Sequence, residues 1–170
     1  NANRVVTAIN RIQVDQVSFS YPTRPDAVLK DVTVTLNAGE IVGFVGASGS
    51  GKSTLAKLIM GWYPVSHGQI LIDGNDLATI KPTALRNQMN YLPQTPVFFS
   101  ESVRDNLTLH DPAITDQQIW TVLDQVKLRA RLEQMSHGLD TVVAASHVPF
   151  SSGEQQRLEL ARALLHPSSV

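Results

Sequence analysis

Hydrophobic residues alternate with polar ones along the first half of the chain and recur every three or four positions along the second half. Alternation is typical of strands and the longer spacing of helices, whereas a short continuous apolar run indicates a buried strand. Strands are predicted at residues 11–21, 28–36, 41–46, 69–74 and 89–92, and helices at 52–61, 83–87, 102–107, 115–126, 130–135 and 153–165. The alternation slips between Val14 and Val17, which predicts a bulge in the first strand. The pattern therefore predicts an α/β fold with its strands concentrated before residue 93.

The composition narrows the class of protein without identifying a function. The chain has 170 residues, 42% hydrophobic and 17% charged, which is enough for the core of one ordinary domain and unlike a disordered chain. The absence of cysteine excludes a disulfide framework, a thiolate zinc site and a cysteine nucleophile. A net charge of −1 gives no overall attraction to nucleic acid or anionic lipid. No apolar run approaches the roughly 20 residues of a membrane-spanning helix, so we expect a soluble domain or a soluble piece of a larger protein.

One motif has a specific chemistry. Residues 46–54, GASGSGKST, match the phosphate-loop pattern G-x-x-x-x-G-K-[ST] in full, between a predicted buried strand and a predicted helix. Glycines let backbone N–H groups approach phosphate, Lys52 supplies a cation, and the Ser53 hydroxyl can bind Mg²⁺. The residues predicted to bind a nucleotide here are Gly46, Ser48, Gly49, Ser50, Gly51, Lys52, Ser53 and Thr54. GTP, nucleoside and other phosphate-loop enzymes share the pattern, and a glycine-rich turn without a ligand is the plainer alternative.

Three further stretches stand in a fixed order around this loop. FSYP at 19–22 precedes it, YLPQ at 91–94 follows it, and FSSGEQQR at 150–157 comes last. With these motifs the sequence resembles, from Ile12 to Val170, the nucleotide-binding domain of an ABC transporter of the exporter type. The resemblance implies an α/β phosphate-loop NTPase core with an antiparallel β portion and a helical subdomain. The implied limits are a tail or linker at 1–10, a β-rich nucleotide-binding core at 11–94, a helical subdomain with the signature motif at 95–162, and the start of a return to the core at 163–170.

The resemblance also implies roles for single residues near the phosphate loop. Tyr21 would stack on adenine, a contact that tolerates any base. Gln94 would bind Mg²⁺ or hold the attacking water, so Lys52 and Gln94 are the predicted catalytic residues and Ser53 and Gln94 the predicted metal ligands. The plainer alternatives are that Tyr21 is a core aromatic and that Gln94 is a solvated loop residue.

Two more stretches are implied to contact partners. Ser151 and Gly153 would contact the γ-phosphate of an ATP that a second subunit holds, with donors at a helix N-terminus. The stretch 95–107, TPVFFSESVRDNL, resembles the exporter form of a surface that faces the membrane domains in relatives. The adjacent Phe98 and Phe99 support such a contact, and local core packing is the alternative.

Taken as a whole, the resemblance implies the ATP-binding domain of an ABC exporter, an ATPase that uses ATP and Mg²⁺. Its partners would be a second nucleotide-binding domain, head to tail, and a transmembrane domain fused on the N-terminal side, with no nucleic acid. It would lie at the cytoplasmic face of a membrane, the inner membrane in a bacterium. Relatives carry the acidic strand required for hydrolysis directly after the position of Val170. We therefore expect these 170 residues to be incomplete at the C-terminus, to lack part of the core and to be inactive alone.

Several positions depart from the family pattern. Ser152 stands where the signature has glycine. Glu154 replaces glutamine and places a carboxylate near an anionic ligand, which costs electrostatic energy unless the carboxylate points at ribose hydroxyls or a cation. Serine and Glu154 can also form a capping pair at the start of the helix. Ala144–Ala145 stand where exporters often have a Gly-Glu pair. These departures leave open a degenerate or regulatory nucleotide-binding module without significant hydrolysis. A soluble ABC ATPase of translation or DNA repair is a further alternative, which the exporter-like stretch at 95–107 disfavours.

Overall fold

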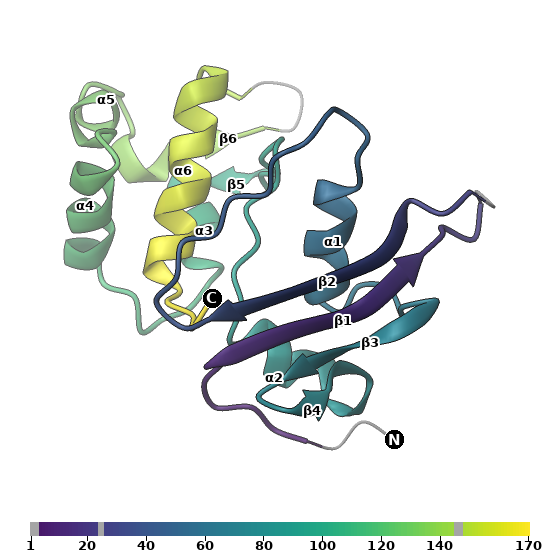
Figure 1. Cartoon of the computed structure of the whole chain (residues 1–170). Coiled ribbons are helices and arrows are strands. Elements are labelled where there is room, and N and C mark those ends of the chain that lie inside the picture. Colours follow the sequence, from purple (N-terminus) through teal and green to yellow (C-terminus); the bar gives the residue numbers. More distant parts are fainter. Residues whose placement is uncertain (1–3, 24–25, 145–147) are drawn as a thin grey trace. The chain divides into compact units, whose positions relative to one another are not determined.

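The computed structural model describes residues 4–23, 26–144 and 148–170, and the chain divides into two compact units (Figure 1). The first unit comprises Asn1–Asn90 with Ser168–Val170, and the second comprises Tyr91–Pro167. Each unit has a hydrophobic core of its own. Within the described ranges, no helix is both long enough and apolar enough to cross a membrane.

The first unit is built on a four-stranded antiparallel sheet in the order β2–β1–β3–β4. Its strands are β1 (Arg11–Phe19), β2 (Leu29–Asn37), β3 (His67–Ile72) and β4 (Asn75–Asp76). Val14 in the central strand pairs with Val34 on one side and with Ile70 on the other. The predicted bulge is confirmed, because the register shifts between Val14 and Val17 and Gln16 takes the left-handed conformation, with φ 48°.

Three short helices pack onto the apolar side chains of this sheet. They are α1 (Lys52–Ile59), the 3₁₀ helix η1 (Leu77–Thr79) and α2 (Pro82–Arg86), in which proline begins the helix. Their buried residues join those of the sheet in one cluster, which also includes Ile9 from the stretch before β1. The fully buried centre of this core consists of Val14, Val17, Leu58, Ile70 and Ile72.

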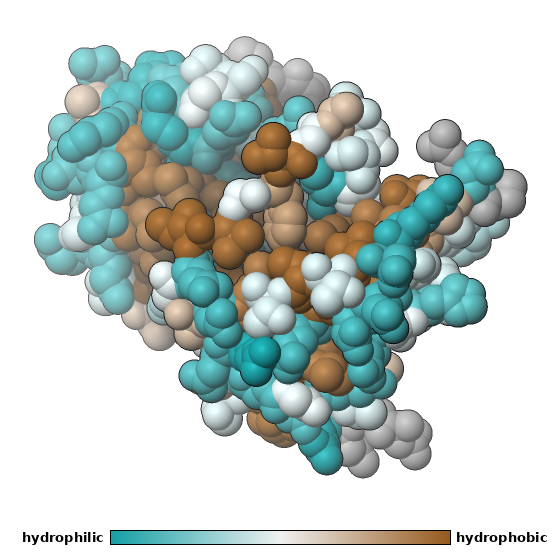
Figure 2. Space-filling view, viewed as in Figure 1, coloured by the Kyte–Doolittle hydropathy of each residue, from teal (hydrophilic) through white to brown (hydrophobic). Residues whose placement is uncertain are grey.

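Two of the predicted strands are wrong. Segments 41–46 and 89–92 lie outside every strand of the structure, although both carry apolar side chains. Ile41 and Val45 are essentially fully exposed, and Figure 2 shows hydrophobic side chains at the surface along the path that joins β2 to α1 in Figure 1. A strand forms only where a neighbouring strand accepts its ladder of hydrogen bonds, and the described strands leave 41–46 without one. The second segment instead runs beside the last residues, where Asn90 N donates to Val170 O at 2.7 Å.

The second unit is mainly helical. Its elements are β5 (Glu101–Ser102), α3 (Val103–Thr108), α4 (Asp116–Gln125), α5 (Arg129–Glu133), the 3₁₀ helix η2 (Gly138–Asp140), β6 (Val142–Val143) and α6 (Ser152–Leu165). The four helices predicted for this half are confirmed, with ends that move by one or two residues. The short strands β5 and β6 pair antiparallel, and α6 packs against α3 and α4. Thr115 and Gln118 form a capping box that begins α4.

Candidate nucleotide-binding site

The phosphate loop leads directly into α1, as its sequence predicts. Gly51 precedes the helix in the left-handed conformation, with φ 92°, and a Cβ at this position would lie 2.5 Å from Leu29 Cδ2. Because Gly51 has no side chain, the N–H groups at the start of α1 receive no side-chain cap. The helix therefore begins with a partial positive charge beside an exposed loop, a geometry that favours an anionic group.

Lys52 is the cation of this loop, and its side chain folds back over the loop. Its Nζ donates to the carbonyl oxygens of Gly46 and Ala47, both at 2.8 Å, and to Ser50 Oγ at 3.3 Å. Ser50 N donates to Ala47 O at 3.2 Å and tightens the same turn. The ammonium group is thus held by neutral oxygens of the loop, which a phosphate can replace with a charge-assisted hydrogen bond.

Tyr21 follows the end of β1 and lies beside the start of α1. Its hydroxyl is 3.1 Å from Oγ1 of the buried Thr54, and its ring packs edge-on against Phe19 at 4.9 Å and Tyr63 at 5.3 Å. Phe19 is buried in the core, whereas Tyr21 is half-buried. The structure therefore brings together Tyr21 and Thr54, which the sequence places 33 residues apart.

Gln94 belongs to the second unit and lies in an irregular, exposed segment that ends before β5. The other predicted metal ligand is the hydroxyl of Ser53, which lies in the first turn of α1. In the described part of the chain, no group of three or more histidine, cysteine, aspartate or glutamate side chains could hold a metal ion. Mg²⁺ commonly keeps several waters and takes substrate phosphates with few protein ligands, so the Ser53 hydroxyl fits this ion when a bound phosphate completes the coordination.

The signature residues form the N-terminus of α6, where Ser151 and Glu154 make a complete capping box. Glu154 Oε2 accepts hydrogen bonds from Ser151 N at 2.8 Å and from Ser151 Oγ at 2.9 Å, while Oε1 lies 3.6 Å from Arg131 Nε. The hydrogen bond from the Ser151 backbone is the main cause that lowers the pKa of Glu154 below its ordinary value. Of the alternatives open in the sequence, the structure thus selects helix capping, with Arg131 as the nearby cation.

The backbone around the signature is open to a ligand at one position and anchored at another. A Cβ on Gly153 would meet no atom within 4 Å, so the approach to this residue is free. Phe150 is buried, and its carbonyl oxygen accepts a hydrogen bond from Gln155 Nε2 at 2.8 Å. Ser152 is exposed as the first residue of α6. Of the Ala144–Ala145 departure, Ala145 lies outside the described residues.

Sequence reasoning overlooked two residues that organise this unit. Arg131 has no motif, and its position beside Glu154 follows only from the packing of α5. Asn106 is one of the few buried polar residues, and a polar residue on a predicted amphipathic turn gives no signal of burial. A Ser151–Glu154 spacing is a capping signal that the sequence does carry.

Comparison with known proteins agrees with the site. Residues 29–170 match the family described as ABC transporter. Two proteins of Staphylococcus aureus, each by name a multidrug export ATP-binding/permease protein, from strains NCTC 8325 / PS 47 and COL, are 38% identical over 156 residues. The match covers 92% of this chain and 27% of each relative. A solved structure of a bacterial Atm1-family ABC exporter with ATP bound aligns with 99% of this chain and 30% of its own, with a TM-score of 0.91 and 30% identity.

The chain therefore spans about a quarter of the length of the relatives that it matches. Part of a solved exporter structure with ATP bound has this fold at 30% identity, and the α/β fold predicted from the sequence is confirmed. With a phosphate loop at the start of α1 and a family match that covers most of its residues, the chain belongs to the ABC transporter family, as an ATP-binding domain of the exporter type.

Proposed function

We propose that this chain binds MgATP at the loop 46–54 and couples ATP binding and hydrolysis to export across a membrane. The observation that carries the proposal is the geometry of that loop. Lys52 Nζ donates hydrogen bonds to two carbonyl oxygens of the loop, each at 2.8 Å, and the loop leads into a helix N-terminus without a side-chain cap. This arrangement is suited to the β- and γ-phosphates of a nucleotide.

The binding step is an exchange of partners at the loop. Phosphate oxygens would take the place of the Gly46 and Ala47 carbonyl oxygens at the ammonium of Lys52, while the backbone N–H groups of the loop bind the remaining phosphate oxygens. Mg²⁺, with Ser53 and Gln94 as its proposed protein ligands, would neutralise part of the phosphate charge. Tyr21, beside Thr54, would offer its ring to the adenine base.

The other proposed face of the nucleotide comes from a second domain of the same kind. Arranged head to tail, the second domain would place its Ser151 and Gly153 at the γ-phosphate held by Lys52 of the first. The free approach to Gly153 and its place at the N-terminus of α6 support this role. Closure of the pair around two ATP molecules would then depend on both nucleotides.

The relatives supply the wider proposal. Those of Staphylococcus aureus are named as ATP-binding and permease proteins in one chain, so we propose a fused transmembrane domain on the N-terminal side and a place at the cytoplasmic face of a membrane. We also propose that a segment outside these 170 residues supplies the acidic strand, with the water-activating carboxylate, and pairs with residues 41–46. The exposure of Ile41 and Val45 supports this pairing. On this proposal the 170 residues alone do not hydrolyse ATP.

The proposal is tested by nucleotide binding with the variant Lys52→Ala in the full-length protein. Loss of one charge-assisted contact weakens binding by about 1.5–3 kcal/mol, or roughly ten- to a hundredfold. Binding of the fluorescent analogue TNP-ATP measures this change, and ATP turnover should fall with it. The matched control is Lys30→Ala, which removes an exposed lysine of β2. Equal affinity of the Lys52→Ala variant and the unchanged protein would refute the proposed site.

The second candidate function is a nucleotide-binding module without significant hydrolysis. Ser152, Glu154 and Ala145 are the departures that favour it. The capping box gives Glu154 a role that does not depend on loss of activity, so this departure no longer favours the second candidate. A large gain of ATP turnover on Glu154→Gln would restore it.

A further inference from the structure

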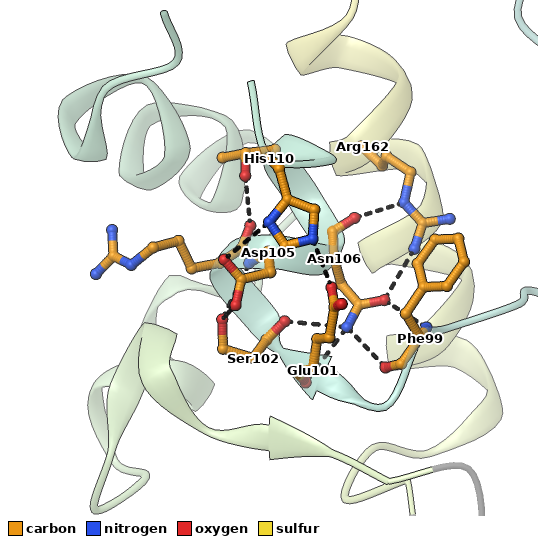
Figure 3. Close-up of polar contacts among 9 residues, drawn as sticks. Phe99, Glu101, Ser102, Asp105, Asn106, His110 and Arg162 are labelled. Carbon is orange, nitrogen blue, oxygen red and sulfur yellow. Dashed lines mark hydrogen bonds and ion pairs between the residues drawn. The ribbon is translucent and has the colours of Figure 1, made fainter. Parts of the chain in front are cut away.

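The loop between Gln94 and α3 is hydrogen-bonded by a buried side chain, that of Asn106, in addition to the pairing of β5 with β6 (Figure 3). Asn106 Oδ1 accepts a hydrogen bond from Phe99 N at 2.8 Å. Its Nδ2 donates to the carbonyl oxygens of Phe99 and Ser102, both at 3.0 Å, and lies 3.4 Å from that of Glu101. The side chain is 2% exposed, so these hydrogen bonds are shielded from water and each lost partner would be costly.

The same loop is tied to α6 by Arg162. Its Nε donates to Asn106 O at 2.7 Å, and its terminal nitrogens lie 3.2 Å from Val97 O and 3.4 Å from Asn106 Oδ1. The guanidinium also lies over the ring of Phe98, 5.4 Å from its centre. A planar fork with several donors can reach all these acceptors at once, and a lysine cannot.

Arg162 itself is fixed by an ion pair within α6. Its Nη1 lies 2.9 Å from Glu159 Oε2, and the two side chains are 13% and 12% exposed. Burial raises the pKa of Glu159, and the charge of Arg162 opposes that change. An ion pair this well buried holds its geometry only when its remaining donors are satisfied, and here the loop carbonyl oxygens satisfy them.

The helix that carries Arg162 begins at the signature residues. Arg162 lies eleven positions after Ser151, about 16 Å along the helix axis. Leu158 and Ala161, between them, are buried in the core of the second unit. A displacement at the N-terminus of α6 would therefore reach Arg162 with little loss, because a packed helix moves as one body.

We propose that Asn106 and Arg162 form a clamp that makes the loop 97–102 move with α6, so that engagement of a nucleotide at Ser151 repositions the loop. The inference rests on the proposed function, because the nucleotide and the membrane partner come from it. The loop presents two apolar side chains, with Val97 65% and Phe99 54% exposed, next to the polar Ser100 and Glu101. Phe98 points the other way and packs against the core, so the two adjacent phenylalanines divide contact and anchoring between them. Asn106 and Arg162 are positioning residues, which act through the loop and not on the nucleotide.

The test is the mobility of a spin label attached at Phe99→Cys in the full-length protein, reconstituted in lipid nanodiscs. This chain has no cysteine of its own, so any others outside it are first replaced by serine. Electron paramagnetic resonance spectra are recorded with and without MgATP, and TNP-ATP binding is measured on the same samples. We expect MgATP to change the label mobility in the protein with Arg162. The variant Arg162→Lys, which keeps the charge but loses the fork, should raise the mobility without nucleotide and reduce the MgATP-dependent change by about twofold or more.

Controls separate the clamp from general loss of structure. Arg129→Lys makes the same substitution in α5, at an arginine that pairs with Glu133, and should leave the response of the label intact. Glu159→Gln, which removes the anchor of the guanidinium and keeps its shape, should weaken the response even if Arg162→Lys does not fold. A full MgATP response in both clamp variants, or no response in the unsubstituted labelled protein that binds TNP-ATP, would overturn the clamp. Failure of the unsubstituted protein to bind TNP-ATP would instead refute the proposed function, and the nucleotide-driven movement with it. In that case the clamp is judged without nucleotide: label mobility in Arg162→Lys equal to that in the unsubstituted protein would refute the attachment of the loop to α6.

Discussion

The carboxylate of Glu154 should stabilise the first turn of α6, and its loss should be measurable there. Glu154 accepts two hydrogen bonds from Ser151, and its side chain is 20% exposed beside Arg131. A capping contact contributes about 0.5–2 kcal/mol, typically near 1. A negative charge at a helix N-terminus adds about 0.3–1 kcal/mol, and a surface ion pair adds less than about 1 kcal/mol. Glu154→Ala should therefore cost about 1–2 kcal/mol, whereas Glu154→Gln keeps an acceptor and should cost about 0.5–1 kcal/mol.

Amide hydrogen exchange at residues 154–156 of the full-length protein, the first N–H groups of α6 with acceptors, measures this local cost. An opening made easier by about 1–2 kcal/mol speeds exchange by roughly five- to thirtyfold for Glu154→Ala, and by less for Glu154→Gln. Glu133→Ala, at an exposed glutamate of α5, is the matched control and should leave α6 unchanged. Exchange of the first turn that is the same in the alanine variant and the unchanged protein would refute the capping role.

The effect depends on pH in a defined direction. Because the hydrogen bonds from Ser151 lower the pKa of Glu154 in the folded protein, the unfolded chain binds the proton more readily. The stabilisation is thus fully present above the ordinary pKa of a glutamate and is lost as the pH falls through the lowered value. Protection of the first turn should therefore decline on acidification in the unchanged protein, and this contribution should be absent from the Glu154→Gln variant.

Two other predictions concern the first unit. Gly68→Ala should lower the free energy of unfolding, measured by urea denaturation, by about 2–4 kcal/mol, because a Cβ there would lie 2.3 Å from Gln16 O at a φ of 77°. The control Gly39→Ala has a similar φ but no atom within 4 Å of its Cβ, so it should lower the free energy of unfolding only by the strain of the left-handed backbone, about 1–2 kcal/mol. Tyr21→Phe should bind TNP-ATP nearly as well as the unchanged protein, whereas Tyr21→Leu should bind about 1–3 kcal/mol more weakly because it removes the stacking face; equal loss in both variants would show that the hydroxyl contact with Thr54 is what matters.

The local geometry of the phosphate loop could be predicted from the sequence, because glycine and lysine at fixed spacing have few alternatives. The bulge in β1 could also be predicted, since the alternation of apolar and polar residues slips between Val14 and Val17 and leaves one extra residue. Gln16, in this stretch, takes the left-handed conformation. The contact between Tyr21 and Thr54 was not, because it joins residues that only the packing of α1 on the sheet brings together. The same holds for Asn106, whose burial depends on a loop that has no repeating pattern.

The wrong strand at 41–46 shows what an apolar pattern can and cannot predict. Its continuous run of apolar residues indicates that the segment is suited to a buried position between neighbouring strands. β-Propensity reflects how well side chains pack in such a position more than a preference of the backbone itself. In the described residues no strand lies beside it, so Ile41 and Val45 are exposed and the backbone forms no ladder. At the signature, by contrast, Ser151 and Glu154 need only each other, because capping is completed within one turn of helix. A strand prediction therefore holds where a partner strand is present, as β1 is for β3, and fails at 41–46 and 89–92, where the described residues supply none.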